Sequence, residues 1–408
     1  MSALSARPIP MSSAWLLPEH LADVLPSEAK RIEGLRRALT DEAQAYGYEL
    51  VMPPLLEHLD SLLSGTGRTL GLQTFKLVDQ LSGRTLGLRA DTTPQVARID
   101  AHLLNRPGVV RLCYCGPVVH TRPAGPWSSR EPLQFGAELY GHLGLEADLE
   151  VLELALDGLR QAGVKDAVLD LGDARIANAL VQALGLDTEA RPPLLAALSA
   201  KDGGAMAEAL AVLQPTGKAL QASAAAGIKR LLGLYGPVSV LDRAAEELPA
   251  LPPITQALAD LRRIVRHVQA THPDVRIGVD LADLGGQDYY SGIRFSVMGL
   301  SASQVLASGG RYDHVGRVFG RERPAVGFSL DLKALSQALQ AGAPAPVPRP
   351  AIRAPWSEDA GLRAAVRALR SRGETVVCIL PGHEHEAQEF ACDRELVQVA
   401  GQWVLQAL

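Results

Sequence analysis

Asp91, Thr92 and Thr93 are the first residues whose types and spacing could do chemistry, in the segment Leu88-Arg-Ala-Asp-Thr-Thr-Pro94. A carboxylate at the end of a strand could hold an ammonium group, and the hydroxyls could fix the direction of that bond. Aspartate and threonine are also common caps of a following helix. The segment therefore predicts either a site for a cationic group or a helix cap, and both interpretations stay open.

Gln134 and Glu138 form a second polar pair, four residues apart in a segment that ends at Gly141. In a strand, this spacing puts both side chains on one face, with Gly136 between them. A glycine there would let a ligand approach the backbone closely. The alternating residues are apolar and indicate a buried opposite face: Leu133, Phe135, Ala137 and Leu139. An exposed polar strand face is the alternative interpretation.

Tyr289, Tyr290 and Arg311 could complete a site. The paired tyrosines precede a Ser-Gly turn, so they could form a rigid wall with hydroxyls at its rim. Arg311 follows two glycines in Gly309-Gly-Arg-Tyr-Asp313, and its guanidinium could pair with Asp313 or with a ligand carboxylate. A structural turn explains the same residues.

The elements that position these residues begin with a helix capped by Ser27 and ending near Tyr46. A proline-bearing edge strand, 49–57, follows it, and then a hairpin formed by 73–79 and 84–89. Farther along, we expect a helix and two antiparallel strands joined by a loop that carries Arg122: residues 94–104, 109–116 and 132–141. Such strands frame a flat, open binding surface.

Three domain features are expected in the rest of the chain. Residues 149–272 read as mainly helical, with a small helical insertion at about 185–260, before the sheet resumes at 275. A Pro/Ala linker, 341–350, separates a first domain, 1–340, from a short C-terminal α/β segment, 351–408. The fold class is therefore α/β, or α+β.

Composition restricts the function classes. The 408 residues are 47% hydrophobic with a net charge of -5, and no basic stripe for nucleic acid is visible. Cys113 and Cys115 read as small buried side chains rather than zinc ligands. Because no leader or membrane-spanning run is present, we expect a cytoplasmic protein with no membrane association, no metal and no cofactor.

Taken in order, the motifs resemble the catalytic domain of histidyl-tRNA synthetase from residue 18 to about 335. The resemblance implies a class II aminoacyl-tRNA synthetase-like antiparallel sheet flanked by helices, and a homodimeric core. It also implies histidine contacts for the residues that match the family's pocket: Asp91, Thr93, Gln134, Glu138, Tyr289 and Tyr290. Asp91 replaces the family's glutamate, so the carboxylate at this position is carried on a side chain that is shorter by one methylene group.

The departures from the family concern its arginines. Gly285 and Ala334 stand where the family has arginines, and the second motif is one residue short, with Arg122 matching only its later arginine. Adenylation needs cations on the transferred phosphate, and losing one such group typically costs on the order of 100- to 1000-fold in rate. We therefore predict no catalytic residues.

This combination is similar to the synthetase-like regulatory subunits of ATP phosphoribosyltransferase, in the loop Val119–Gln134 and in the short C-terminal segment. The resemblance implies a non-catalytic subunit for the first step of histidine biosynthesis. Its implied partner is the short-form catalytic subunit, in a hetero-oligomer, with histidine as an effector. Two alternatives stay open: an active divergent synthetase using Arg122, Arg130 or Lys333, and a degenerate RNA-binding or sensor module.

Overall fold

The computed structural model divides into two compact units, Met1–Ala341 and Gly342–Leu408. The structure describes residues 15–63, 68–126, 128–186, 190–211, 219–283, 290–299, 305–340, 350–383 and 391–408. Gly285 and Tyr289 lie outside the described residues. Each unit is described by itself.

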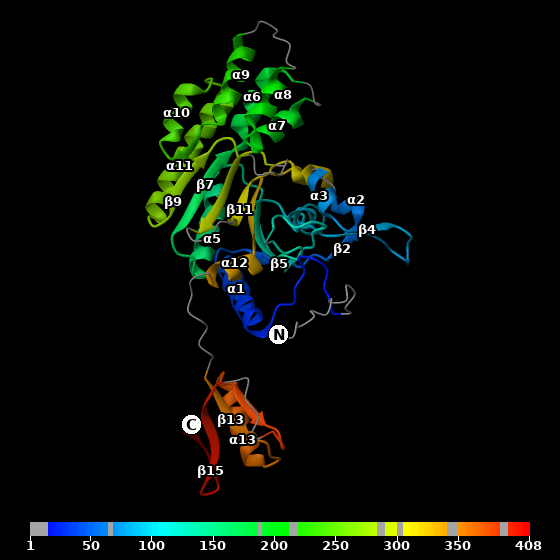
Figure 1. Ribbon diagram of the computed structural model, residues 1–408, viewed down its shortest axis with the longest axis vertical. Helices are drawn as coiled ribbons and strands as arrows, with labels where there is room; N and C mark the ends of the chain where they lie inside the picture. Colours follow the sequence, from blue (N-terminus) through cyan, green and yellow to red (C-terminus); the bar gives the residue numbers. More distant parts are fainter. Residues whose placement is uncertain are drawn as a thin grey trace, which may run out of the picture. The chain divides into compact units, whose positions relative to one another are not determined.

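A nine-stranded sheet forms the centre of the first unit (Figure 1). Its strands, in spatial order, are β1 (Glu49–Leu50), β5 (Val110–Pro117), β6 (Leu133–Tyr140), β12 (Ala325–Asp331), β11 (Val305–Arg311), β10 (Ile293–Gly299), β7 (Ala167–Asp173), β9 (Arg276–Asp280) and β8 (Tyr235–Pro237). The predicted antiparallel sheet is confirmed, except that β1 pairs with β5, and β7 with β9, in parallel. The edge position of β1 also agrees with the prolines that follow it, which cannot donate to a neighbouring strand.

One face of the sheet packs against three long helices, α1 (Pro26–Ala45), α5 (Leu145–Gln161) and α11 (Pro252–Thr271), and the shorter α12 (Leu332–Gln340). The apolar stripe expected on the first helix supplies Ile32, Leu35 and Leu39 to the main core. The expected Ser27 cap is wrong. The helix begins at Pro26, whose fixed φ suits a first turn, and its N-cap Leu25 makes no side-chain bond.

The other face is covered only in part. The helix α4 (Thr93–Arg98), the π-helical turn Ile99–Leu104 and the 3-10 turn Val315–Phe319 pack on β5 and β6 around a second, smaller core. Beside them stands the predicted hairpin, in a three-stranded sheet of β2 (Leu56–His58), β4 (Thr85–Leu88) and β3 (Lys76–Val78). Two short helices, α2 (Leu59–Leu62) and α3 (Arg68–Gln73), precede the hairpin.

Helices also fill most of the chain between β7 and β9, and they gather at one end of the first unit (Figure 1). They are α6 (Ala174–Leu184), α7 (Arg191–Ser199), α8 (Gly203–Ala211), α9 (Ala219–Leu231) and α10 (Val240–Glu247). The region is less separate than an insertion at 185–260 implies. Its strand β8 pairs with β9, and its apolar side chains, such as Leu198 and Ile228, join the main core.

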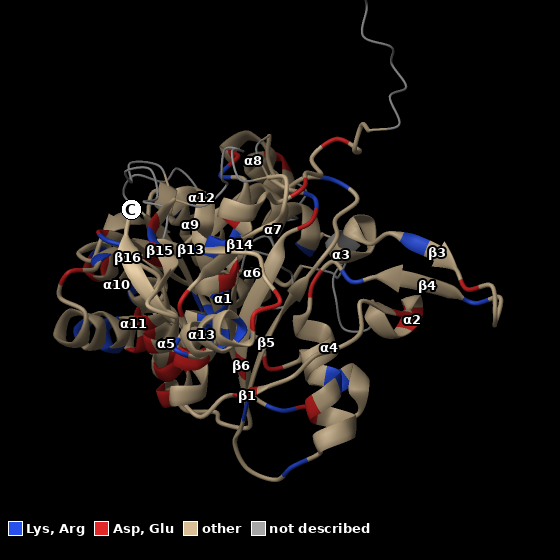
Figure 2. Ribbon diagram, turned by 90° about the horizontal axis from the view of Figure 1, so that it is seen from below, with Lys and Arg blue, Asp and Glu red and all other residues tan. Residues whose placement is uncertain are grey.

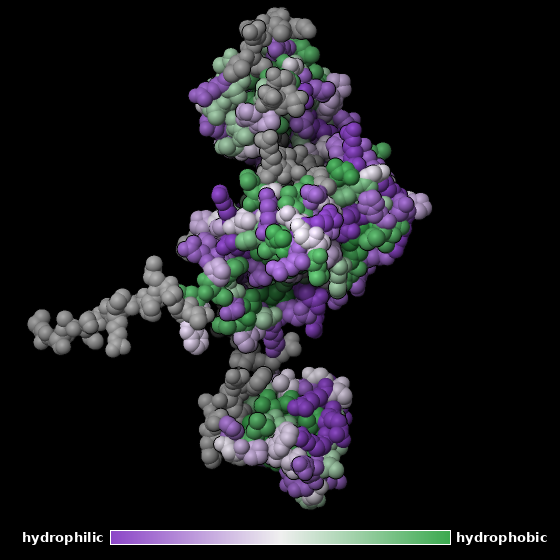
Figure 3. All heavy atoms as spheres, turned by 90° about the vertical axis from the view of Figure 1, so that its right-hand side faces the viewer, coloured by the Kyte–Doolittle hydropathy of each residue, from purple (hydrophilic) through white to green (hydrophobic). Residues whose placement is uncertain are grey.

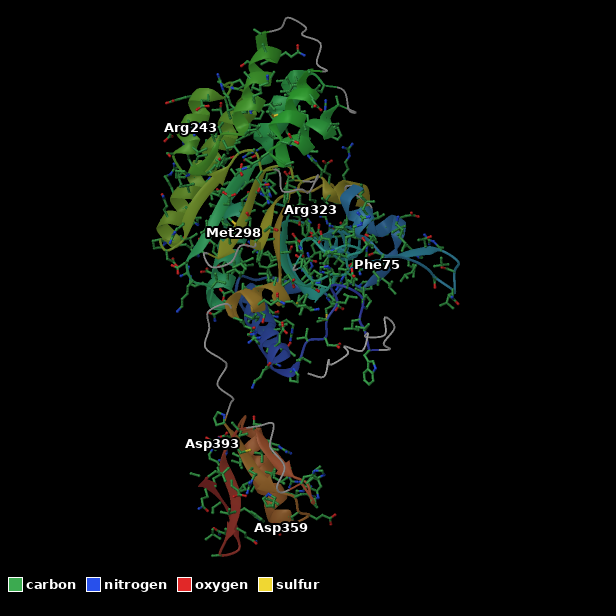
Figure 4. The ribbon with its side chains drawn as sticks, viewed as in Figure 1. Phe75, Arg243, Met298, Arg323, Asp359 and Asp393 are labelled. Atoms are coloured by element: carbon green, nitrogen blue, oxygen red, sulfur yellow. The ribbon has the colours of Figure 1, made fainter. Side chains whose placement is uncertain are left out.

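The C-terminal unit is a four-stranded sheet with one helix. The strand order is β14 (Val376–Ile379), β13 (Ala351–Pro355), β15 (Cys392–Val399) and β16 (Gln402–Ala407). The helix α13 (Ala360–Ser371) is capped by Asp359, labelled in Figure 4, which accepts a 2.7 Å hydrogen bond from Leu362 N. The strand β13 directly follows the proline-rich segment 341–350.

Candidate functional site

A cavity of about 370 Å³ opens on the partly covered face of the large sheet. It lies over strands β6, β12, β11 and β10, beside the segment that follows β5. The polar side chains that line it are Gln73, Asp91, His120, Gln134, Tyr290, Arg294, Ser308, Ser329 and Asp331. A recess of about 20 Å³ shares Tyr290, Ser308 and Ser329 with the cavity and is also lined by Thr93, Glu138 and Tyr312.

Glu138 is the most buried carboxylate of the recess, with 1% of its surface exposed. Three hydroxyls donate to it: Thr93 Oγ1 over 2.8 Å, Tyr114 over 3.2 Å, and Tyr312. Burial raises the pKa of Glu138 to about 8, although the hydrogen bonds oppose the shift. The group can therefore exchange a proton near neutral pH, and it can accept hydrogen bonds from a ligand.

Asp91 and Gln134 meet in the larger cavity. Gln134 Nε2 donates to Asp91 Oδ1 over 2.8 Å, and Gln134 Oε1 accepts from Thr92 N over 3.0 Å. Asp91 Oδ1 also accepts from Thr93 N over 3.3 Å, so part of the expected helix-cap role is present. Among the described residues, no group donates to Asp91 Oδ2, which leaves this oxygen available for a cation.

Two glycines at or near the recess stand where a side chain would not fit. A Cβ atom on Gly327 would lie 2.7 Å from Ala137 O and would overlap the carboxylate of Glu138. One on Gly136 would lie 2.8 Å from Phe328 O and would overlap the Tyr114 hydroxyl. The glycine expected between Gln134 and Glu138 therefore makes room for a tyrosine that supports the glutamate.

Five of the residues expected in a pocket surround this space: Asp91, Thr93, Gln134, Glu138 and Tyr290. Arg311 is not among them. Its Nε lies 3.1 and 3.2 Å from the carboxylate oxygens of Asp148, on the helix-covered face, and its NH1 lies 3.3 Å from Asp313. The structure thus gives Arg311 a buried ion pair with Asp148 and a contact with Asp313 instead of a ligand carboxylate, because the open face of β11 is the opposite one.

The three cations that a divergent synthetase could use, Arg122, Arg130 and Lys333, also lie apart from the cavity lining. Arg122 is exposed in the loop after β5. Arg130 lies 5.2 Å over the ring of Phe75, which Figure 4 labels, and donates to His120 O, so it joins this loop to the segment that begins the hairpin. Lys333 pairs with Glu131 over 3.2 Å. Within the described lining, the cation is Arg294, which sequence reasoning missed.

Ala334, one of the two positions where the family has an arginine, is part of a helix start. Ala334 lies in the first turn of α12, and Asp331 Oδ1 accepts from Leu133 N and Lys333 N, each over 3.0 Å. Burial raises the pKa of Asp331. This end of the cavity therefore offers a carboxylate where adenylation would need a cation.

Cys113 and Cys115 are free thiols whose pKa burial raises to about 11. In the part of the chain that the structure describes, no group of three or more His, Cys, Asp or Glu side chains could hold a metal ion. No helix in that part is long and apolar enough to cross a membrane.

The fold and the site define a histidyl-tRNA synthetase-like protein, and the family model described as Histidyl-tRNA synthetase matches residues 20–335. A second model, for the C-terminal domain of ATP phosphoribosyltransferase subunit HisZ, matches residues 349–406. The chain belongs to the family of ATP phosphoribosyltransferase regulatory subunits. It is 58% identical to the regulatory subunit of Albidiferax ferrireducens and 59% identical to that of Variovorax paradoxus, over 97% of this chain and 100% of each relative.

Solved structures agree with this assignment. A regulatory subunit/histidyl-tRNA synthetase from Bacillus halodurans superposes with a TM-score of 0.75 at 26% identity, covering 91% of this chain and 93% of that one. Histidyl-tRNA synthetase from Nostoc sp. PCC 7120 gives a TM-score of 0.74 at 20% identity, with 97% of each chain covered, and shows the fold alone. The non-catalytic, regulatory role predicted from the missing arginines is confirmed, and the active-synthetase alternative is not favoured.

The distribution of charged residues bears on the remaining alternative, a degenerate RNA-binding or sensor module. In Figure 2, Lys and Arg are interspersed with Asp and Glu along the ribbon. That the chain does not bind nucleic acid stays a prediction.

Proposed function

We propose that this chain assembles with the short-form catalytic subunit of ATP phosphoribosyltransferase and adjusts its activity to the concentration of histidine. The enzyme opens histidine biosynthesis, so such control would be feedback inhibition. The observation that carries the proposal is the presence of two carboxyl groups in adjoining spaces: Glu138 is buried in the recess, and Asp91 is half-buried in the cavity beside it. The expected cytoplasmic location stays a prediction.

Histidine suits this arrangement chemically. Its imidazole carries N–H groups that can donate to the buried carboxylate of Glu138, with the ring against Tyr290. Its ammonium group can reach Asp91 Oδ2 and share the polar frame of Gln134. A ring nitrogen at one end and an ammonium group at the other would thus meet one acceptor each.

Regulation would follow from linkage between this cavity and the assembly with the catalytic subunit. If histidine binds one quaternary state better than another, it shifts the population toward that state, and assembly changes histidine affinity by the same factor. The contact from Thr93 to Glu138 joins α4 to β6, so a ligand at Glu138 would act on two elements at once.

A homodimeric core is the second part of the proposal. Large apolar side chains are exposed on the segments from 52 to 81: Met52, Leu56, Leu72, Leu77, Val78 and Leu81. Figure 3 shows the side of the first unit where these segments lie, with hydrophobic side chains among hydrophilic ones. A second copy of the chain would cover such a surface, which a monomer rarely leaves exposed.

The primary experiment measures ATP phosphoribosyltransferase activity of the short-form catalytic subunit with and without this chain, over a histidine titration. We expect activity to depend on the chain and to fall as histidine rises. The chain alone should show no histidine-dependent exchange of pyrophosphate into ATP. Equal activity of the catalytic subunit with and without this chain would refute the regulatory assembly. Activity that stays unchanged as histidine is added would refute the feedback role.

Sedimentation of the chain alone tests the homodimer. We expect a dimer for the unmodified chain and a shift toward monomer for Leu81→Lys, because a charge would enter the apolar contact. A matched Leu143→Lys variant, at another exposed leucine (79% exposed), should sediment like the unmodified chain. A monomer at micromolar concentration would refute this part of the proposal.

A further inference from the structure

A straight row of residues crosses the large sheet beneath the cavity. In the strand register, Glu138 of β6 pairs with Gly327 of β12, and Gly310 of β11 pairs with both Gly327 and Arg294 of β10. Residues directly paired in a sheet point to the same face. Glu138 and Arg294 therefore point to the same side of the sheet, with two glycines between them.

The two glycines add no side chain to this row, and their neighbours lie over them: the carboxyl group of Glu138 overlaps the position of a Cβ atom on Gly327, and Tyr290 Cε1 lies 3.0 Å from that of a Cβ atom on Gly310. Neighbouring strands lie about 4.8 Å apart, so the backbones of Glu138 and Arg294 are separated by about 14 Å. Arg294 lines the cavity and Glu138 lines the recess that adjoins it, so a guanidinium and a carboxyl group are available to one ligand.

Arg294 lines the cavity and is only partly satisfied. Its side chain is 12% exposed and forms an ion pair with Asp283, which is 31% exposed. Its buried Nε has no hydrogen-bond partner among the described residues. A guanidinium offers five donors in a planar fork, so the Asp283 pair leaves donors for another acceptor.

We propose that Arg294 binds the carboxylate of the amino-acid ligand and so replaces the cation missing at Gly285. This inference rests on the proposed histidine site. It assigns the ligand class as an α-amino acid with its carboxylate intact: a nitrogen heterocycle at Glu138, an ammonium group at Asp91, and a carboxylate at Arg294. Asp283 holds the guanidinium in position, and the donors that this ion pair leaves are the ones that the carboxylate accepts from.

A purely structural ion pair is the competing explanation, and the two differ in ligand selectivity. If Arg294 binds the carboxylate, removing it should weaken histidine and leave histidinol, which has an alcohol in that place, nearly unchanged. If the ion pair only supports the cavity wall, its loss should weaken both ligands equally.

The test is calorimetric titration of the full chain with histidine and with histidinol. For the unmodified chain, we expect histidine to bind about 10- to 100-fold more tightly than histidinol, the range of one charge-assisted contact. Arg294→Met should reduce this ratio to about threefold or less. Arg111→Met is the matched control, because Arg111 is half-buried in β5, is paired with Glu150 over 2.6 Å and lies outside the cavity lining.

The possible outcomes distinguish the role of Arg294 from the existence of the histidine site. Equal binding of histidine and histidinol to the unmodified chain would overturn the role of Arg294 while leaving the histidine site intact, and this comparison needs no folded variant. A selectivity that survives Arg294→Met, or that falls equally in Arg111→Met, would overturn it as well. Failure of the unmodified chain to bind either ligand would instead refute the proposed histidine site.

Discussion

Thr93 Oγ1 donates a 2.8 Å hydrogen bond to Glu138 Oε1, and this contact ties the start of α4 to the middle of β6. The same carboxylate accepts from the hydroxyls of Tyr114 and Tyr312. Three donors fix both oxygens of a group that the fold has removed from water. Such an arrangement preorganises the glutamate for a ligand, because its position no longer depends on the ligand's arrival.

Glu138→Gln should weaken histidine binding by about 10- to 100-fold, because an imidazole N–H would favour the ionised carboxylate as its acceptor, and an amide cannot ionise. Glutamine keeps the volume of the side chain. An alanine at this position would instead leave three hydroxyls without an acceptor in a buried site. Calorimetric titration with histidine measures the change.

The control for this substitution is Glu150→Gln, at a carboxylate on α5 that pairs with Arg111 away from the cavity. Its histidine affinity should match that of the unmodified chain. Unchanged affinity in Glu138→Gln would place the histidine site elsewhere.

The raised pKa of Glu138 also predicts that the stability of the chain depends on pH, and Glu138→Gln tests this dependence. The pKa of Glu138 rises from an ordinary 4.5 to about 8 on folding, so the folded state keeps a proton that the unfolded state releases between these values. The contribution to stability is complete below pH 4.5 and is lost as the pH rises through 8. The stability of Glu138→Gln relative to the unmodified chain should therefore increase over this window, by at most about 5 kcal/mol.

Thermal unfolding at a series of pH values from 5 to 9 measures this difference. Above about pH 9 it should stay constant, because the carboxyl group is then ionised in both states. A difference that does not change between pH 5 and 8 would mean that the hydroxyls, and not burial, dominate the pKa of Glu138.

Much of the fold could be predicted because its periodicities are unambiguous. Residues 132–141 alternate polar and apolar side chains and form β6, and the apolar stripe of α1 faces the main core. The β3–β4 hairpin is marked by its turn. Element ends were less predictable, since local signals such as Ser27 compete with the proline before it.

The site was only partly predictable because the sequence does not say which face of a strand is open. Arg311 and Tyr312 are neighbours, and a strand sends neighbours to opposite faces. The arginine points to the helix-covered side and pairs with Asp148, whereas the tyrosine reaches Glu138. Arg294 was missed for the same reason: it has no special neighbours in sequence, and only the register of β10 with β11 brings it under the cavity.

Gly327→Ala should abolish histidine binding and lower stability by about 1–3 kcal/mol, the usual cost of overfilling a packed site. The added methyl group would overlap the carboxylate of Glu138 and lie 2.7 Å from Ala137 O, in a sheet that cannot move aside. Gly34→Ala is the control. Its Cβ would meet nothing within 4 Å in α1, so it should bind histidine normally and gain stability, as alanine does in helices. Histidine titration and thermal unfolding of both variants decide the matter, and normal binding by Gly327→Ala would rule out the recess as the imidazole site.

Arg311→Met should destabilise the chain by about 3–5 kcal/mol, because it strands the carboxylate of Asp148 without its cation. Asp148 is 4% exposed, and burial already raises its pKa despite the arginine. Adding Asp148→Leu should restore most of the loss, since apolar side chains can replace a buried ion pair at little cost. Chemical denaturation of both variants measures these free energies, and histidine titration below the unfolding transition should give the affinity of the unmodified chain. If Arg311→Met instead kept its stability and lost histidine binding, the ligand role first expected for Arg311 from the sequence would be correct.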